Sequence, residues 1–244
     1  MNFYAVIIGT EILNGRREDK HFEFVKTELA KFGHELFASF TIKDDKKLIA
    51  NIFEVIKSDE ESILFCFGGI GSTPDDLTRQ IAADVFTKQP LKVHDNFLHD
   101  IIERFGDAAY PHRIHMADLP HNAQLLFNPV NNMSGFSLFN RFYFVPGFPS
   151  MAHPMISSVI EKNYSKSVKK FRLTLIADTS EESLINIMNI LPNTLELSSL
   201  PMFVNAKPKV ELSLSGLNEK EVMSNFGMFK SELDRKKIKY KLIN

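Results

Sequence analysis

The sequence predicts an α/β protein with a mostly parallel sheet covered by helices on both faces, followed by a second, smaller α+β domain. Up to Pro90, short apolar runs alternate with segments of helical spacing, a pattern typical of βαβ units and therefore of a parallel sheet. A polar, lysine-rich segment at residues 162–170 then indicates a linker. We therefore expect one domain over residues 1–164 and another over residues 165–244.

The first elements follow from local patterns. Residues 3–9 are a continuous apolar run closed by glycine, which suits a strand buried on both faces. In residues 21–32 the apolar positions recur at helical spacing, and Gly33 can end that helix. The same reasoning predicts, in order, a strand at 35–42, a helix capped by Asp44 or Asp45, a strand at 62–67 and a helix carrying Leu77, Ile81 and Val85.

After Pro90 the alternation becomes less regular. Residues 95–105 have helical spacing, whereas residues 106–121 are irregular and rich in proline and histidine. The first domain is expected to finish with short strands around an asparagine-rich turn at 124–140, a strand and loop at 141–150 and a helix from about 151 to 163. For the second domain we expect strands at 171–178, 194–200 and 209–216 and helices at 181–191 and 218–237.

Composition excludes several classes of protein. A net charge of −1 predicts no strong non-specific attraction to nucleic acid or to anionic lipid, so neither is expected as a partner. Cys66 is the only cysteine, which rules out an intrachain disulfide and fits the cytoplasm. The amino terminus reads as a first strand rather than a signal peptide, and no run approaches the roughly 20 apolar residues of a membrane span.

The loop at residues 68–72 is the strongest candidate for a binding site. Gly68, Gly69 and Gly71 let backbone N–H groups approach a phosphate closely, and Ser72 follows them. The loop leaves the carboxyl end of a strand, which is where open α/β sheets bind their ligands. It is not a P-loop, because no Lys-Ser or Lys-Thr pair follows the glycines.

Two acids, Asp75 and Asp76, stand directly after this loop and admit two explanations. Thr73 could be a helix N-cap with Pro74 at the first helical position, which would make Asp76 the acid of a capping box. Alternatively, Mg²⁺ could bridge the acids to phosphate, or a carboxylate could accept the N–H groups of a pterin or purine. Capping explains Asp76 better than it explains Asp75.

Two further loops follow strands and should open on the same edge of a parallel sheet. They cover residues 9–19 and 146–150. Together the loops would gather acids in one cleft, namely Glu11, Asp19, Asp45, Asp75 and Asp76. So many acids close together require cations or a ligand rich in hydrogen-bond donors.

In combination, these motifs resemble the N-terminal domain of the CinA family, within the wider MoaB/Mog molybdopterin-binding group. The group's loop reads GGxG, four residues, then DxT, and here ends at Asp76 and Thr78. The resemblance covers roughly residues 4–160, and residues 170–244 more weakly resemble the family's small KH-like middle domain. It implies a three-layer α/β/α fold, a site at this sheet edge and a homo-oligomer. The chain ends before any C-terminal deamidase domain, so nicotinamide-nucleotide deamidation is not expected.

The resemblance and the motifs together define an expected site. The expected catalytic carboxylates are Asp45, Asp75 and Asp76, and the residues expected to hold Mg²⁺ or a similar divalent cation are Asp19, Asp75 and Asp76. The residues expected to bind the ligand and its phosphates are Gly9, Thr10, Glu11, Gly68, Gly69, Gly71, Ser72, Thr78, Pro146, Gly147 and Ser150.

Several residues differ from the family's usual pattern around this site. Cys66 and Phe67 replace two threonines, His21 replaces an asparagine, and Met151 replaces a glutamate. His115 stands in place of a lysine, where it could take over phosphate binding. Arg79 and Arg113 could also neutralise phosphate, although a solvated face or a local ion pair explains them equally well.

Three functional hypotheses remain open. The first is metal-dependent cleavage of the pyrophosphate bond in an ADP-ribose-like nucleotide, which the CinA resemblance implies. The second is binding or adenylylation of molybdopterin in molybdenum cofactor biosynthesis. The third is a binding module without catalysis, which the replacements at the site suggest. The expected partner is therefore a small phosphorylated nucleotide or a molybdopterin.

Overall fold

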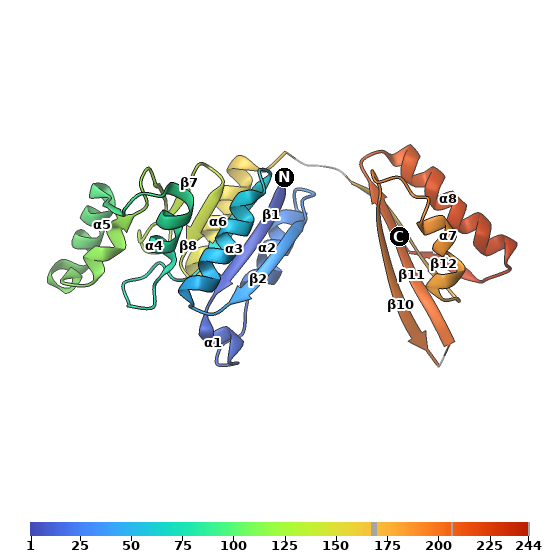
Figure 1. The fold of residues 1–244 in the computed structure, drawn as a ribbon, viewed down its shortest axis with the longest axis horizontal. Helices are drawn as coiled ribbons and strands as arrows, with labels where there is room; N and C mark the ends of the chain where they lie inside the picture. The colour runs from blue at the N-terminus through green and yellow to red at the C-terminus, as the bar shows by residue number, and fades with distance from the viewer. Residues whose placement is uncertain (167–169, 206, 244) are drawn as a thin grey trace. The chain divides into compact units, whose positions relative to one another are not determined.

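The computed structural model describes residues 1–166, 170–205 and 207–243 (Figure 1). The chain divides into two compact units, Met1–Lys166 and Ser167–Asn244. The expected linker at 162–170 lies partly outside the described residues. Within those residues, no helix is both long enough and apolar enough to cross a membrane.

The first unit is built on a six-stranded sheet in the order β2-β1-β3-β8-β7-β6. Its parallel part consists of β2 (Leu36–Ile42), β1 (Asn2–Ile8), β3 (Ser62–Phe67) and β8 (Phe142–Val145). On the far side of β8, β7 (Gly135–Leu138) pairs antiparallel with both β8 and β6 (Gln124–Leu126). The prediction of a mostly parallel sheet is thus confirmed.

Helices cover both faces of this sheet, as predicted. Alternation along β3 places Leu64 and Cys66 toward one core, and Phe65 and Phe67 toward the other. The first core includes residues of α3 (Lys46–Ser58), α4 (Thr78–Ala82) and α5 (Asp95–Phe105). The second includes residues of α2 (His21–Ala30) and α6 (Pro149–Asn163). Each fully buried large apolar side chain stabilises these layers by about 1.5–3 kcal/mol.

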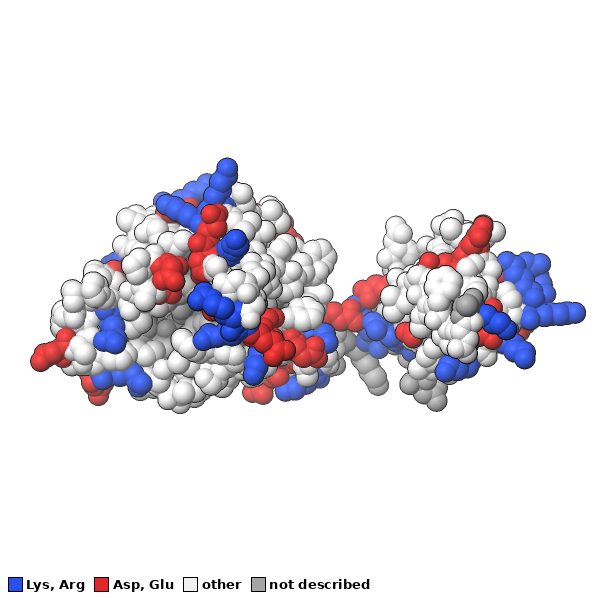
Figure 2. Space-filling view, turned by 90° about the horizontal axis from the view of Figure 1, so that it is seen from below, with Lys and Arg blue, Asp and Glu red and all other residues white. Residues whose placement is uncertain are grey.

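The connections hold several shorter elements. After β1 comes a single helical turn, α1 (Thr10–Leu13), and α4 continues into a π-helical turn at Ala83–Thr87. The irregular part after Pro90 contains a two-stranded ladder of β4 (Lys92–Val93) with β5 (Asp118–Leu119). It also holds two 3₁₀ turns, at Gly106–Ala109 and Arg113–Ala117. On the face of the first unit seen in Figure 2, acidic and basic side chains are interspersed.

The second unit is a four-stranded antiparallel sheet in the order β10-β11-β9-β12, with α8 packed on one face. The strands are β9 (Phe171–Ala177), β10 (Glu196–Val204), β11 (Lys207–Gly216) and β12 (Tyr240–Ile243), and α8 spans Glu219–Arg235. This arrangement confirms the α+β class. The expected helix at 181–191 is only a 3₁₀ turn, Glu181–Ser183, followed by the short α7 (Ile185–Met188). The KH-like assignment stays a prediction.

Candidate functional site

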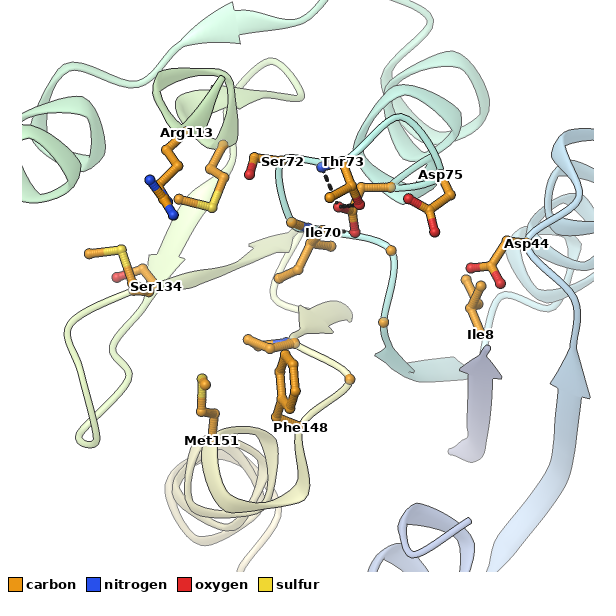
Figure 3. A pocket seen from close by; sticks show the side chains of 18 of the residues that line it. Ile8, Asp44, Ile70, Ser72, Thr73, Asp75, Arg113, Ser134, Phe148 and Met151 are labelled. Carbon is orange, nitrogen blue, oxygen red and sulfur yellow. Dashed lines mark hydrogen bonds between the residues drawn. The ribbon is translucent and has the colours of Figure 1, made fainter. Parts of the chain in front are cut away.

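The carboxyl ends of β1, β3 and β8 open on one cavity of about 480 Å³ (Figure 3). That volume is in the range of pockets that hold small organic ligands. The cavity brings together nine of the predicted site residues: Glu11, Gly68, Gly69, Gly71, Ser72, Asp75, Asp76, Pro146 and Gly147. The parallel sheet therefore gathers the loops as expected, because parallel strands end at the same edge.

The glycine loop has a backbone that only glycine adopts easily. Gly68 and Gly69 have φ values of 101° and 69°, in the left-handed region. A Cβ on Gly69 would lie 2.2 Å from the Thr78 Oγ1 atom. Thr78 is buried beneath the loop, where its hydroxyl donates to the Gly68 carbonyl at 3.0 Å and its N–H to the Gly69 carbonyl at 2.9 Å. The predicted ligand-binding role of Thr78 thus becomes one of loop support.

Backbone donors of this loop remain available to a ligand. The Gly68 N–H donates to the Val145 carbonyl, and the Gly71 N–H donates to the Asp76 carboxylate. In the described part of the chain, the N–H groups of the three remaining loop residues donate to no protein acceptor; these are Gly69, Ile70 and Ser72. Successive unpaired N–H groups at a strand end form an anion-binding nest.

The two acids after the loop do different things. Asp76 holds the loop together, because its carboxylate accepts from the Gly71 N–H at 2.8 Å, the Thr73 N–H at 2.8 Å and the Thr73 hydroxyl at 2.7 Å. Asp75 lines the cavity, and the Thr73 side chain close by, together with the Asp75 N–H, lowers the pKa of its carboxyl. Asp75 therefore stays ionised at neutral pH.

The structure corrects the helix-capping interpretation of Thr73. Helix α4 begins at Thr78, with Leu77 as its N-cap, so Thr73 and Pro74 belong to the loop. The predicted pairing of Thr73 with Asp76 is present, but it closes a turn in the loop instead of opening a helix. Arg79 braces the same loop from inside the core, donating to the carbonyls of Ile70 and Gly71.

Of the adjacent acids Asp44 and Asp45, the structure places Asp44 in the cavity. Its carboxylate accepts from the Thr10 N–H and the Thr10 hydroxyl, each at 2.8 Å. Asp45 caps α3 instead, accepting from the Leu48 N–H at 2.8 Å. Successive side chains of an extended backbone point in opposite directions, so a step of one residue separates the two roles. The catalytic role expected for Asp45 has no support in this arrangement.

Three other predicted site residues, Gly9, Asp19 and Ser150, do not line the cavity. Gly9 packs against the Glu11 carboxylate, because a Cβ there would be 3.0 Å from Glu11 Oε2. Asp19 caps α2, accepting from the His21 N–H at 2.8 Å, and lines a different surface hollow. Ser150 is exposed in the first turn of α6.

The acids do not form a metal centre of their own. Asp19 lies in a different hollow from Asp75 and Asp76, so the expected trio is not brought together. Among the described residues, no three His, Cys, Asp or Glu side chains gather as a group able to hold a metal ion. Asp44 and Asp76 already accept hydrogen bonds from the protein. The residues present thus do not fit a preformed metal site.

Two arginines, Arg17 and Arg113, line the cavity together with its acidic residues and carry the opposite charge. Arg17 lies 3.7 Å from the Glu11 carboxylate, and its guanidinium is 5.7 Å from the centre of the Phe148 ring. Arg113 lies over the ring of Phe105 at 4.8 Å. Arg17 was not predicted, although the Arg-Arg pair at 16–17 in the first loop was a visible signal.

The remaining wall is largely apolar. Figure 3 shows the carboxylates of Asp44 and Asp75 at one end of the cavity, and Ser134 and Met151 toward the other. The apolar side chains of the wall include Phe97, Phe105, Met116, Met133, Phe148 and Met151. Flexible methionines and an aromatic ring suit contact with the flat face of a heterocycle. Phe97, Phe105, Met116 and Met133 come from segments after Pro90 whose apolar side chains the sequence did not assign to the site.

The replaced residues Phe67 and His21 lie behind the cavity, in contact with each other. Their rings are stacked with centroids 4.4 Å apart. The His21 Nε2 atom is 3.3 Å from the Gly147 carbonyl, and His21 Nδ1 is 3.3 Å from Nε2 of His153. His153 in turn stacks on Phe24 at 3.8 Å. These rings support the 146–148 loop from below, so the cavity stays open.

Comparisons with known proteins agree with the fold of the first unit. A family model described as "Probable molybdopterin binding domain" matches residues 4–166. A CinA-like protein of Nostoc punctiforme is 30% identical over 162 residues, covering 64% of this chain and 38% of the relative. A putative competence-damage inducible protein of Streptococcus agalactiae is 24% identical, covering 98% of this chain and 60% of the relative.

Among solved structures, the protein CinA of unknown function from Thermoplasma acidophilum superimposes with a TM-score of 0.60 at 26% identity. The match covers 66% of this chain and 96% of that one. The expected resemblance to CinA proteins is confirmed by these matches. The chain spans about 38–60% of the length of the curated relatives just described.

Proposed function

Because the chain belongs to the family of probable molybdopterin-binding domains, we propose that its first unit binds a phosphorylated heterocycle, either a pterin or a nucleotide. One observation carries the proposal: Gly69, Ile70 and Ser72, whose N–H groups donate to no acceptor among the described residues, line the same cavity as an apolar wall. Such a combination suits a ligand that has an anionic group at one end and a flat ring at the other.

The phosphate of the ligand would lie on the glycine loop. There it would accept hydrogen bonds from the three free N–H groups, and the positive charges of Arg17 and Arg113 would offset its negative charge. The ring would pack on the wall that contains Met133, Phe148 and Met151. The carboxylates of Asp44 and Asp75 would then accept hydroxyl or N–H donors from the rest of the ligand.

A divalent cation has a limited place in this proposal. Mg²⁺ commonly binds through one or two carboxylates together with the phosphates of a ligand. Since the residues that the structure describes offer no metal cage, we expect Mg²⁺ to raise affinity only for ligands with adjacent phosphates. The ionised Asp75 is the carboxylate available to it.

A calorimetric titration of the full chain would test the binding proposal. The ligands are AMP, ADP-ribose and a pterin, each with and without Mg²⁺, with adenosine as the ring lacking phosphate. We expect saturable binding of at least one phosphorylated ligand. The affinity for adenosine should be lower than for that ligand by about tenfold or more. Asp19→Asn is the matched control, because Asp19 lies in another hollow. Absence of binding by every phosphorylated ligand would contradict the proposal.

A second candidate function is cleavage of the pyrophosphate bond in an ADP-ribose-like nucleotide. The observation that favours it is Asp75, an ionised carboxylate in the cavity that is not needed to hold the loop. Incubation with ADP-ribose and Mg²⁺ should then release AMP, measured by chromatography, and Asp75→Asn should abolish the release. If ADP-ribose binds but is not cleaved, the binding role stands and the catalytic role is contradicted. Self-association into a homo-oligomer stays a prediction that light scattering can test.

A further inference from the structure

A second hollow of about 590 Å³ adjoins the cavity and shares Ser72, Thr73 and Arg113 with it. Its other side is formed by residues of the 108–115 segment and by Arg79. We call it the arginine hollow, after Arg79 and Arg113. In the functions proposed above, neither its histidines nor Arg79 has a part.

Arg79 is a buried cation that forms no direct ion pair with an acid in the described residues, although the charges of Asp76 and Asp118 act on it from a greater distance and partly oppose the lowering of its pKa by burial. Its relative exposure is 7%, and it donates only to the carbonyls of Ile70 and Gly71. Its Nε atom has no hydrogen-bond partner among the described residues. Buried arginines are almost always paired with an acid, because an uncompensated charge is expensive to remove from water. The nearby Asp76 carboxylate is occupied by donors of the loop.

Arg113 is likewise paired only with uncharged groups. It donates to the Ala108 carbonyl at 2.5 Å and lies over the Phe105 ring. Over residues 1–166, 170–205 and 207–243, neither Arg79 nor Arg113 forms an ion pair within 4.0 Å. Two such cations in the wall of one hollow create a positive potential that attracts anions.

The rest of the wall adds uncharged or basic donors. His112, His115 and Tyr110 line it together with the hydroxyls of Ser72 and Thr73. The described residues of this wall include no carboxylate. Asp118 stands behind His115, whose Nδ1 donates to it at 2.9 Å, and this bond fixes the imidazole in place.

We propose that the arginine hollow is a second anion site that binds a phosphate group, either as free phosphate or as the end of a nucleotide. Arg113 supplies the accessible guanidinium donors and Arg79 supplies charge from the wall. Planar guanidinium groups are well matched to the oxygens of phosphate. Arg113 also lines the glycine-loop cavity, where the proposed function gives it a part, so Arg79 is the residue that separates this site from that function.

Nuclear magnetic resonance of the full chain, titrated with inorganic phosphate, tests this directly. We expect saturable shifts of the Nε–H signals of Arg79 and Arg113. The Nε–H of Arg141 already donates to the Ser62 carbonyl at 2.7 Å, so its signal should stay unchanged. An Arg79 signal that stays unchanged with both inorganic phosphate and ADP-ribose, or an equal shift at Arg141, would overturn the proposal.

A pair of variants separates specific binding from general loss of charge. Arg113→Gln should weaken phosphate binding about tenfold or more, since hydrogen bonds to charged groups are strong. Arg104→Gln is the control, because Arg104 also donates to a carbonyl, that of Asn131, and lies over Phe105, yet does not line the hollow. Equal weakening in both variants would overturn the proposal, and circular dichroism checks that each variant is folded.

A titration with ADP-ribose, which has two phosphates, identifies the source of the phosphate. If the hollow receives the end of a nucleotide, ADP-ribose should shift the Arg79 Nε–H and the Gly69 amide together. If it receives free phosphate, inorganic phosphate alone should shift the Arg79 signal. Both results support the site, whereas a shift confined to the Gly69 amide with both probes would contradict it.

Discussion

The imidazole of His21 stacks on the ring of Phe67, with their centroids 4.4 Å apart and their planes 23° from parallel. From the sequence, both residues differ from the pattern expected of CinA proteins, and the structure brings the two side chains into contact. The stacked pair fills the space beneath the 146–148 loop, and His21 Nε2 reaches the Gly147 carbonyl. An aromatic pair therefore supports a loop of the cavity from the core side.

Replacing His21 by asparagine, the residue usual in the family, should destabilise the protein. The shorter side chain leaves the face of Phe67 uncovered and creates a gap in a buried layer, so we expect a loss of about 1–3 kcal/mol. Urea denaturation measures the change in unfolding free energy. His99→Asn, on the exposed surface of α5, is the control and should change it by about 0.5 kcal/mol or less. Equal stability of His21→Asn and the wild type would show that the stacking is energetically neutral.

The pair of His21 and His153 predicts a loss of stability in mild acid. Burial lowers the pKa of His21, and burial together with the neighbouring His21 lowers the pKa of His153 to about 4. Because the unfolded histidines, with a pKa of about 6.5, bind protons first as the pH falls, stability is full above that value. It should then fall as the pH drops toward about 4, although Asp19 and Glu28 lie nearby and oppose the shift of His153.

Urea denaturation at about pH 7 and about pH 5 measures this effect, which we expect to be about 1 kcal/mol because His153 is only partly buried. His153→Phe keeps the stacking on Phe24 and removes one titrating group. It should flatten the pH dependence. A variant that keeps the full dependence would assign it to other groups.

Alanine at Gly69 should distort the glycine loop and abolish ligand binding. The added Cβ would lie 2.2 Å from Thr78 Oγ1, and the φ of 69° is itself unfavourable for alanine. We expect about 1–3 kcal/mol of destabilisation and a loss of phosphate-dependent binding by calorimetry. Gly227→Ala in α8 is the control, since no atom lies within 4 Å of its Cβ position and alanine is the better helix former. Wild-type affinity in Gly69→Ala would remove this loop from the site.

The sequence indicated those parts of the site that depend on local patterns. An apolar run followed by glycines predicts a strand end with a backbone that can approach a ligand, and Gly68, Gly69 and Gly71 line the cavity. The role of Thr78 was not visible in the same way. Whether its hydroxyl faces a ligand or the Gly68 carbonyl depends on how α4 packs beneath the loop, which no short pattern contains.

The opposite wall of the cavity was beyond sequence reasoning for another reason. Met116 and Met133 come from a region without regular periodicity, and only its tertiary packing brings them to the loop; Arg113 of the same region was named as a possible phosphate ligand but not placed in this wall. The strand β12 was missed because it is brief, and the helix predicted at 181–191 is reduced to a 3₁₀ turn and the short α7.

The adjacent acids Asp44 and Asp45 allow the clearest separation of binding from stability. Asp44 lines the cavity and holds Thr10, whereas Asp45 caps α3 through the Leu48 N–H. We expect Asp45→Ala to lower the unfolding free energy by about 1 kcal/mol, as loss of an N-cap does, and to leave ligand affinity unchanged. Asp44→Asn retains a side-chain oxygen for Thr10 but loses the charge, so it should alter ligand affinity more than stability.

Calorimetry with the ligand and urea denaturation, applied to both variants, decide between these roles. The distinction follows from the extended backbone at Asp45, which turns the two side chains to opposite sides. A loss of affinity in Asp45→Ala with none in Asp44→Asn would reverse the assignment and restore Asp45 as the functional carboxylate.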